Sequence, residues 1–135
     1  MIVYKHIKDF DEKHIEELFK SVNWISGNFP YVLKQALKYS TRVISAWDGE
    51  KLVGLIRGMD DGVWQATIDC LLVDPQYQRR GIASALLNSL LEEYRDYFYV
   101  NVTPDEKENV AFYQKYGFEI LQSGTPLQIK GNALK

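Results

Sequence analysis

The chain has 135 residues, of which 46% are hydrophobic and 25% charged, and its formal net charge is −2. This length suits one domain, residues 1–135, built around one hydrophobic core. The near-neutral charge predicts no general attraction to nucleic acid or to an anionic membrane surface. Its one cysteine, Cys70, cannot form a disulfide within the chain, which favours a reducing, cytoplasmic setting.

Two further classes are excluded by local composition. The first six residues lack the apolar core of a signal peptide, and no run of residues is apolar for long enough to span a membrane. The two histidines, His6 and His14, have no partner ligands at a suitable spacing. We therefore expect no metal site.

The first forty residues read as a strand followed by two helices. Residues 2–7 predict the strand, and Asp9 or Asp11 can cap the first helix. Four apolar residues follow at helical spacing and predict its buried stripe: Ile15, Leu18, Phe19 and Val22. An aromatic-rich loop, residues 23–29, either packs to close the domain or faces a substrate as a lid. Pro30 suits the first turn of the second helix.

The middle of the chain predicts a three-stranded meander that leads into the longest helix. Strands over 41–47, 51–56 and 63–73 are separated by Asp48-Gly49 and Asp60-Asp61-Gly62, which are turn signals. A helix over 81–94 presents five residues on one stripe: Ala83, Leu86, Leu87, Leu90 and Tyr94. The strand at 97–103 is reached through this helix, so it should run parallel to the strand before it.

A helix over 106–116 ends the α/β part of the pattern, with Thr103 or Asp105 as its cap. Gly117 stands where a helix stop with positive φ is expected. Two short strands, 118–121 and 127–129, follow. The predicted order is β-α-α-β-β-β-α-β-α-β-β, an α/β domain with a mixed central sheet and helices on both faces.

The junction after the meander has the composition of an anion-binding turn. Pro75 cannot donate to a sheet ladder, so the strand stops at Asp74, and Gly81 opens the next helix. The first N–H groups of a helix are free and partly positive, and glycine lets an anion approach the backbone. Arg79 and Arg80 add charge. The residues therefore allow two readings: a cradle for phosphate or pyrophosphate, or an ordinary strand-to-helix turn.

The full string of residues 73–83, Val-Asp-Pro-Gln-Tyr-Gln-Arg-Arg-Gly-Ile-Ala, closely resembles the acetyl-CoA-binding signature of the GCN5-related N-acetyltransferase (GNAT) family. In that signature Gln/Arg-x-x-Gly-x-Gly/Ala follows Val-x-Pro, and Gln78, Gly81 and Ala83 take the three diagnostic positions. Residues 109–118 resemble a second, late motif of the family through five positions: Asn109, Phe112, Tyr113, Gly117 and Phe118. The two motifs and the element order between them cover most of the chain.

The resemblance implies a role for each matching residue. Main-chain groups of the strand would pair with the pantetheine arm, and the amides of the turn would hold the pyrophosphate. The residues implied in coenzyme binding are Leu71, Leu72, Val73, Gln78, Arg79, Arg80, Gly81, Ile82, Ala83, Ser84 and Asn109. Tyr113 would lie near the sulfur and protonate the leaving thiolate. The alternative for Tyr113 is a core aromatic on an amphipathic helix.

The implied reaction is direct transfer of acetyl from acetyl-CoA to a primary amine of a small molecule or peptide. A strand N–H, that of Leu72 or a neighbour, can stabilise the developing oxyanion. Asp69 is the candidate base because it interrupts an apolar strand just before the coenzyme-contacting backbone. Asp69 is equally well read as a solvated side chain, and Glu106, Glu108 or a water chain can take its place.

Two other functions fit parts of the pattern. A non-catalytic module that senses acetyl-CoA would keep the binding signature, but the intact Tyr113 argues against it. A nucleotide-binding regulatory domain would need a lysine and Ser/Thr after Gly81, which the sequence lacks. The acceptor stays unidentified, and we expect a monomer or a homodimer.

Overall fold

The structure is a computed structural model, and it describes residues 1–104 and 106–132. By its internal contacts the chain divides into two compact units, Met1–Thr103 and Pro104–Lys135. The sequence-based expectation of one domain over 1–135 stays a prediction.

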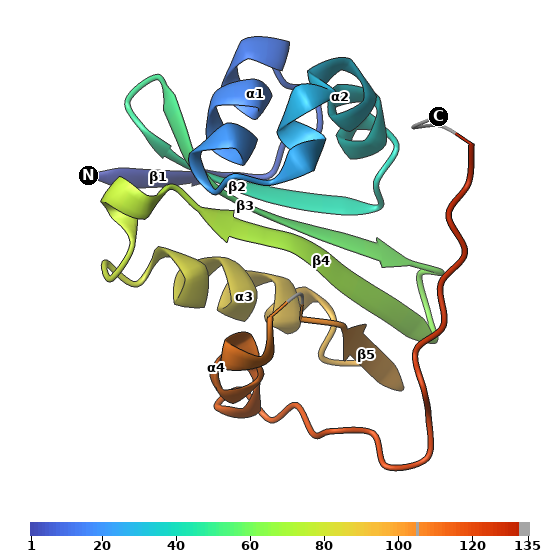
Figure 1. The fold of residues 1–135 in the computed structure, drawn as a ribbon. Helices are drawn as coiled ribbons and strands as arrows, with labels where there is room; N and C mark the ends of the chain where they lie inside the picture. Colours follow the sequence, from blue (N-terminus) through green and yellow to red (C-terminus); the bar gives the residue numbers. More distant parts are fainter. Residues whose placement is uncertain (105, 133–135) are drawn as a thin grey trace. The chain divides into compact units, whose positions relative to one another are not determined.

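The first unit contains a mixed five-stranded sheet in the order β1-β2-β3-β4-β5 (Figure 1). Neighbours are antiparallel from β1 to β4, and β4 pairs with β5 in parallel, as the crossover through a helix predicted. The strands are β1 (Ile2–Lys5), β2 (Arg42–Asp48), β3 (Lys51–Asp60), β4 (Gln65–Val73) and β5 (Tyr99–Val102). The mixed α/β architecture predicted from the sequence is therefore confirmed.

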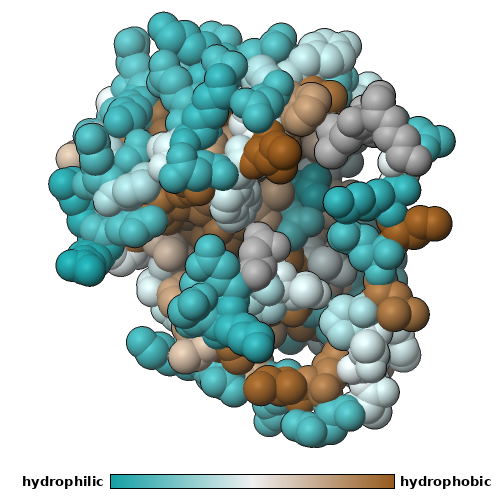
Figure 2. Space-filling view, in the orientation of Figure 1, coloured by the Kyte–Doolittle hydropathy of each residue, from teal (hydrophilic) through white to brown (hydrophobic). Residues whose placement is uncertain are grey.

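Helices α1 (Glu12–Ser21) and α2 (Pro30–Lys38) cover one face of this sheet, and α3 (Ile82–Glu93) covers the other (Figure 1). The predicted stripe of α1 is buried at Ile15, Leu18 and Phe19. The outward surface of these two helices, at the top of the view, is mostly hydrophilic in Figure 2. Amphipathic helices of this kind bury one stripe and leave the charged side chains in water.

The aromatic loop between α1 and α2 contributes to packing at one of its aromatic residues. A short 3-10 helix, Ile25–Asn28, fills the loop, and Trp24 before it packs against the core under α1 and α2. The ring centroids of Trp24 and Phe19 lie 5.9 Å apart in an edge-to-face arrangement, which is favourable for aromatic pairs. The loop was predicted either to pack or to face a substrate as a lid, and for Trp24 the packing role is confirmed.

A polar network ties the far end of the meander to the end of α3. The buried carboxylate of Asp60 accepts hydrogen bonds from Arg42, from the Tyr94 hydroxyl (2.8 Å) and from the Tyr97 hydroxyl (3.0 Å). Burial and the Asp60 contact raise the pKa of Tyr94 above its ordinary value. A buried carboxylate without donors is unfavourable, and these three donors satisfy the one of Asp60. The network therefore holds Tyr97, just before β5, against the end of β3.

The second unit contains a 3-10 turn, Lys107–Asn109, and the short helix α4 (Val110–Gln114). Sequence reasoning predicted one helix over 106–116, which is longer than the structure has. Gly117 has φ of 96°, as the predicted helix stop requires. Of the proposed caps, Thr103 does not adjoin the helix and Asp105 lies outside the described residues.

Several strand predictions were wrong. β1 ends at Lys5, because its ladder ends where Lys5 meets Ser45. β3 continues to Asp60, beyond the predicted end at 56, because its ladder with β4 extends to Ala66. Residues 118–121 and 127–129 form no strand in the described part of the second unit. Their apolar side chains are well exposed: Ile120, Leu121, Leu127 and Ile129. Alternation of apolar residues predicts an extended chain, but a strand also needs a hydrogen-bonding partner, and no ladder reaches these residues.

Candidate functional site

The carboxyl half of β4 has one edge without a strand partner in the first unit. The parallel ladder between β4 and β5 stops at Ile68 and Val102, while β4 continues to Val73. On its other side β4 stays paired with β3 through Leu72 and Val73. The edge at residues 69–73 can therefore accept an extended ligand as an added strand.

The hydrogen-bond phase of β4 shows which amides face this open edge. The N–H of Asp74 donates to the Val53 carbonyl of β3 (2.9 Å). Backbone N–H groups alternate in direction along a regular strand, so the N–H of Leu72 points toward β3 and that of Val73 points toward the open edge. The predicted oxyanion donor, Leu72 or a neighbour, stays a prediction.

A β-bulge lies at the point where β4 leaves β5. Leu55 pairs with Leu72 but Arg57 pairs with Asp69, so one residue of β3 is opposite both Cys70 and Leu71. Cys70 has φ of 53°, a left-handed conformation that a residue with a side chain rarely adopts. Bulges increase local twist and interrupt pairing. This bulge accounts for the separation of β4 from β5 after Ile68.

The turn after β4 is held by side chains of the turn itself and of the β2–β3 hairpin. The Asp74 carboxylate accepts the N–H of Gln76 (2.9 Å) and lies 3.4 Å from Lys51 Nζ. The Gln78 side-chain amide donates to the carbonyl of Val73 (3.1 Å). The side chain of Gln78 therefore stabilises the turn. Gln78 is one of the residues implied in coenzyme binding, and this hydrogen bond gives its side chain a structural role as well.

Arg80 is held in place by an aromatic ring. Its guanidinium lies 4.9 Å from the centroid of Tyr77, and the Tyr77 hydroxyl donates to Asp48 (2.6 Å). The hydrogen bond to Asp48 raises the pKa of Tyr77, so the phenol stays neutral and keeps donating. Lys51 Nζ lies 5.3 Å from the same ring. Two cations thus gather on one tyrosine beside the turn.

Gly81 and the first turn of α3 provide the amides of the predicted cradle. Gly81 is the N-cap with φ of 78°, and a side chain carbon placed on it would meet no atom within 4 Å. The space beside this backbone is therefore open. The N–H groups that begin a helix have no partner within the helix. Together with the exposed Arg79 and Arg80, these amides fit a pyrophosphate, which is the group that acetyl-CoA would place here.

Asp69 is not a free carboxylate. Both of its oxygens accept hydrogen bonds from Arg57, at 2.7 Å to Nε and 2.7 Å to the terminal nitrogen. This bidentate pair also raises the pKa of Arg57, through the hydrogen bond to Asp69. Each carboxylate oxygen keeps a second lone pair, so the pairing with Arg57 leaves proton acceptance possible. The role of Asp69 as a base stays a prediction.

The residues of the late motif lie in the second unit. Tyr113 is buried on α4, and its ring contacts Phe112 at 5.2 Å and Phe118 at 5.6 Å between centroids. Asn109 is exposed and precedes α4 as its N-cap. The motif thus forms a local aromatic cluster ended by Gly117. The predicted roles of Tyr113 and Asn109 toward a coenzyme stay predictions.

Sequence reasoning missed the residues that support the turn and the strand. Asp48, Lys51 and Tyr77 hold Arg80 and Asp74, and Arg57 pairs with Asp69. The Asp48-Gly49 pair was read as a hairpin signal, which it is. Asp48 also accepts a hydrogen bond from the Tyr77 hydroxyl, and this contact depends on packing between segments 29 residues apart.

Comparison with known proteins identifies the class that this fold and edge define: the acetyltransferases. Residues 7–118 match the family model described as "Acetyltransferase (GNAT) family". The match covers well over half of the chain. The chain therefore belongs to the GNAT family, as the two motifs indicated.

Individual relatives are named N-acetyltransferases. "Uncharacterized N-acetyltransferase ycf52" of Pyropia yezoensis is 31% identical over 116 residues, which are 82% of this chain and 66% of that protein. "GCN5-related N-acetyltransferase 2, chloroplastic" of Arabidopsis thaliana is 38% identical over 91 residues, 62% of this chain and 33% of that protein. The chain thus spans from one third to about two thirds of the length of these two relatives.

Solved structures agree in fold. A GNAT family acetyltransferase from Streptococcus pneumoniae has a TM-score of 0.80 at 33% identity, covering 98% of this chain and 99% of that one. A probable acetyltransferase from methicillin-resistant Staphylococcus aureus has a TM-score of 0.85 at 17% identity, covering 97% and 100%. The second likeness concerns the fold alone.

Residues 1–104 and 106–132 contain no helix with the length and apolar character needed to cross a bilayer. In the same residues, His, Cys, Asp and Glu side chains form no group of three or more that could hold a metal ion.

Proposed function

We propose that the chain is an acetyl-CoA-dependent N-acetyltransferase that transfers acetyl directly to a primary amine. The observation that carries the proposal is the open edge of β4, which leads without interruption into the glycine turn and the N-terminus of α3. An extended pantetheine arm suits the edge, and a pyrophosphate suits the turn. Family membership supports acetyl transfer as the reaction.

The chain's own groups have distinct tasks in this proposal. Acetyl-CoA supplies an activated thioester carbonyl and a thiolate leaving group. The outward N–H of Val73, with the main chain of Leu71 and Leu72, binds the arm, and a strand N–H donates to the carbonyl oxygen as it gains charge. Arg79 and Arg80, with the amides from Gly81 to Ser84, hold the pyrophosphate.

Proton transfers are assigned by resemblance to the family. Tyr113 donates a proton to the departing sulfur, and Asn109 contacts the coenzyme arm. Asp69, or a water held near it, takes the proton from the acceptor ammonium. Because the transfer is direct, no nucleophilic side chain is required. The setting is proposed to be cytoplasmic, and the assembly a monomer or a homodimer.

The experiment is thiol release from acetyl-CoA against a panel of polyamines, amino acids, aminoglycosides and peptides. We expect turnover with at least one amine and a drop of about 10²–10⁴ in kcat for Tyr113→Phe. We also expect acetyl-CoA to raise the melting temperature. Stabilisation by acetyl-CoA with no turnover on any amine would favour the alternative, a non-catalytic sensor. Absence of both effects would contradict either function.

A further inference from the structure

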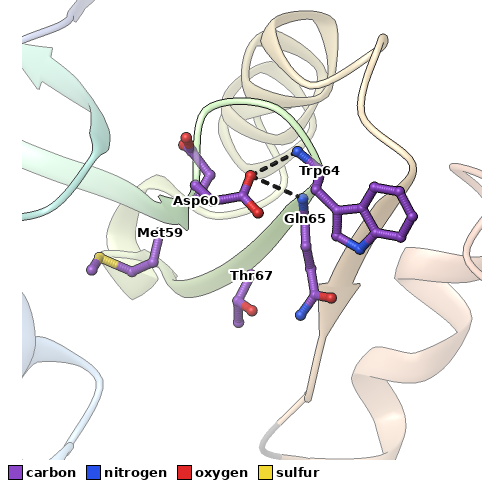
Figure 3. A pocket seen from close by; sticks show the side chains of 6 residues that line it. Met59, Asp60, Trp64, Gln65 and Thr67 are labelled. Carbon is purple, nitrogen blue, oxygen red and sulfur yellow. Dashed lines mark hydrogen bonds between the residues drawn. The ribbon is translucent and has the colours of Figure 1, made fainter.

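An open pocket lies at the end of β3 and the start of β4, at the end of the strand opposite the glycine turn (Figure 3). Its volume is about 440 Å³, within the range of small-molecule sites. Six residues line it: Met59, Asp60, Asp61, Trp64, Gln65 and Thr67. In Figure 3 the side chains of Gln65 and Thr67 project to the same side of β4.

Two lining residues of this pocket lie on the same face of the sheet as Asp69. Side chains alternate along a strand, so Gln65 and Thr67 share a face with Asp69. On β3, Met59 is opposite Thr67 and Arg57 is opposite Asp69. At a rise of about 3.3 Å per residue, Gln65 is roughly 13 Å from Asp69 along β4.

One wall of the pocket is an aromatic ring with a fixed position. Trp64 packs against Phe98 in a tilted arrangement with centroids 4.4 Å apart, and meets Tyr99 edge to face at 5.9 Å. Even so, 47% of its surface stays exposed. A partly exposed indole that is held by its neighbours offers a preorganised face to a cation.

The charge of the pocket comes from Asp61. One of its oxygens accepts the N–H groups of Val63 (2.9 Å), Trp64 (2.7 Å) and Gln65 (3.2 Å). These bonds hold the pKa of Asp61 below its usual range, so it is ionised near neutral pH. Asp60 is already paired with Arg42. None of the six lining residues is basic, so the pocket presents one exposed carboxylate beside an indole.

We propose that this pocket binds a second, non-reacting cationic group of the acceptor, and that the acceptor is an elongated diamine or polyamine. The inference rests on the proposed function and names the substrate class of that site. A reacting nitrogen near Asp69 and a second cation between Asp61 and Trp64 require an extended molecule of about 10–17 Å. A linear polyamine has this length and charge pattern.

Steady-state kinetics with a matched pair of amines tests the proposal. Spermidine and n-nonylamine have about the same length, but only spermidine carries a cation at its far end. We expect kcat/KM to be at least about tenfold higher for spermidine. Asp61→Asn keeps an oxygen for the three backbone N–H groups and removes only the charge, and it should raise KM for spermidine about tenfold with little change in kcat.

Control variants separate the effect of the ring and the effect of the Asp61 charge on KM from an effect of substitution on folding. Trp64→Leu should also raise KM for spermidine, whereas Trp64→Phe should retain most of the affinity because a ring remains. Glu16→Gln removes an exposed carboxylate on α1, where Glu16 pairs with Lys20, and should leave both amines unaffected. Equal kcat/KM for the two amines, or an Asp61→Asn variant that is unchanged with spermidine, would overturn the assignment.

Calorimetry distinguishes failure of this assignment from failure of the proposed function. Spermidine should bind the CoA-saturated protein, and Asp61→Asn should weaken that binding about tenfold. If no amine is turned over but this binding difference holds, the pocket assignment stands and the transferase proposal fails. If n-nonylamine is turned over and spermidine binding does not depend on Asp61, the transferase proposal stands and the pocket assignment fails.

Discussion

At the scale of single residues, the turn after β4 is organised by side chains that would not themselves touch a ligand. Tyr77 places the guanidinium of Arg80, and Asp48 fixes the phenol from the β2–β3 hairpin. Among the described residues, Arg79 has no ring contact of this kind. Its backbone has a left-handed conformation, with φ of 66°. The two arginines of the motif are thus held in different ways.

This difference predicts unequal effects of substitution on coenzyme affinity. Arg80→Ala should raise KM for acetyl-CoA about tenfold with kcat little changed, since a charge-assisted bond to phosphate is worth roughly 1.5–3 kcal/mol. Tyr77→Leu should reproduce part of that loss, because Arg80 keeps its charge but loses its support. Tyr77→Phe keeps the ring and should lie between wild type and Tyr77→Leu.

Titration of CoA by calorimetry checks the same ranking without turnover. The account requires Arg80→Ala to be the weakest binder of the three variants. An Arg80→Ala variant with unchanged affinity would show that the guanidinium contacts no phosphate.

The side-chain pairs around the candidate site, such as Arg57 with Asp69, could not be predicted from the sequence, and the reason is physical. Asp69 was read as a solvated carboxylate or a base, but Arg57 pairs with it only because the bulge at Cys70 shifts the β3–β4 register by one residue. Hydrophobic alternation fixes which face a residue occupies, and a bulge changes that assignment locally. The positive φ of Gly117, in contrast, was predictable, since a helix stop of this kind is a local backbone requirement.

At the scale of elements, the sheet and its helices followed the periodicity of the sequence, whereas the C-terminal strands did not. The stripes of α1 and α3 and the parallel step to β5 depend on local pattern and on crossover geometry. A strand depends on a partner. Residues 118–121 and 127–129 have the right composition, but no described residue pairs with them as a ladder. Composition alone does not show whether a partner strand is present.

The packing of α3 on β3 gives a prediction at this scale. A Cβ at Gly58 would overlap the Tyr94 hydroxyl, which is held by Asp60 and is buried. Gly58→Ala should therefore lower the free energy of unfolding by about 1–3 kcal/mol, the usual cost of overpacking. Gly124→Ala is the matched control, because a Cβ there meets nothing within 4 Å.

Urea unfolding of both variants measures these energies, with Tyr94→Phe as a second background. Removing the hydroxyl relieves the overlap, so Gly58→Ala should cost less in the Tyr94→Phe protein than in wild type. Equal costs in the two backgrounds would show that the glycine is required for another reason.

At the scale of the molecule, the two proposed binding sites lie at opposite ends of one strand of the first unit. β4 leads at its carboxyl end to the glycine turn and at its amino end to the pocket of Asp61 and Trp64. The open edge lies between them. The family motifs indicated the proposed coenzyme end, since a coenzyme would impose the same backbone requirements wherever it binds. The acceptor end has no shared motif, because its chemistry depends on which side chains surround the pocket.

We propose that acetyl-CoA binds along the open edge of β4 and at the N-terminus of α3. Amide hydrogen exchange, followed by NMR with and without acetyl-CoA, measures this binding residue by residue. We expect slower exchange at Val73 and at the amides from Gly81 to Ser84, with a smaller change at Leu72, whose N–H points toward β3. Protection confined to other segments, with these amides unchanged at saturating acetyl-CoA, would show that the coenzyme binds elsewhere.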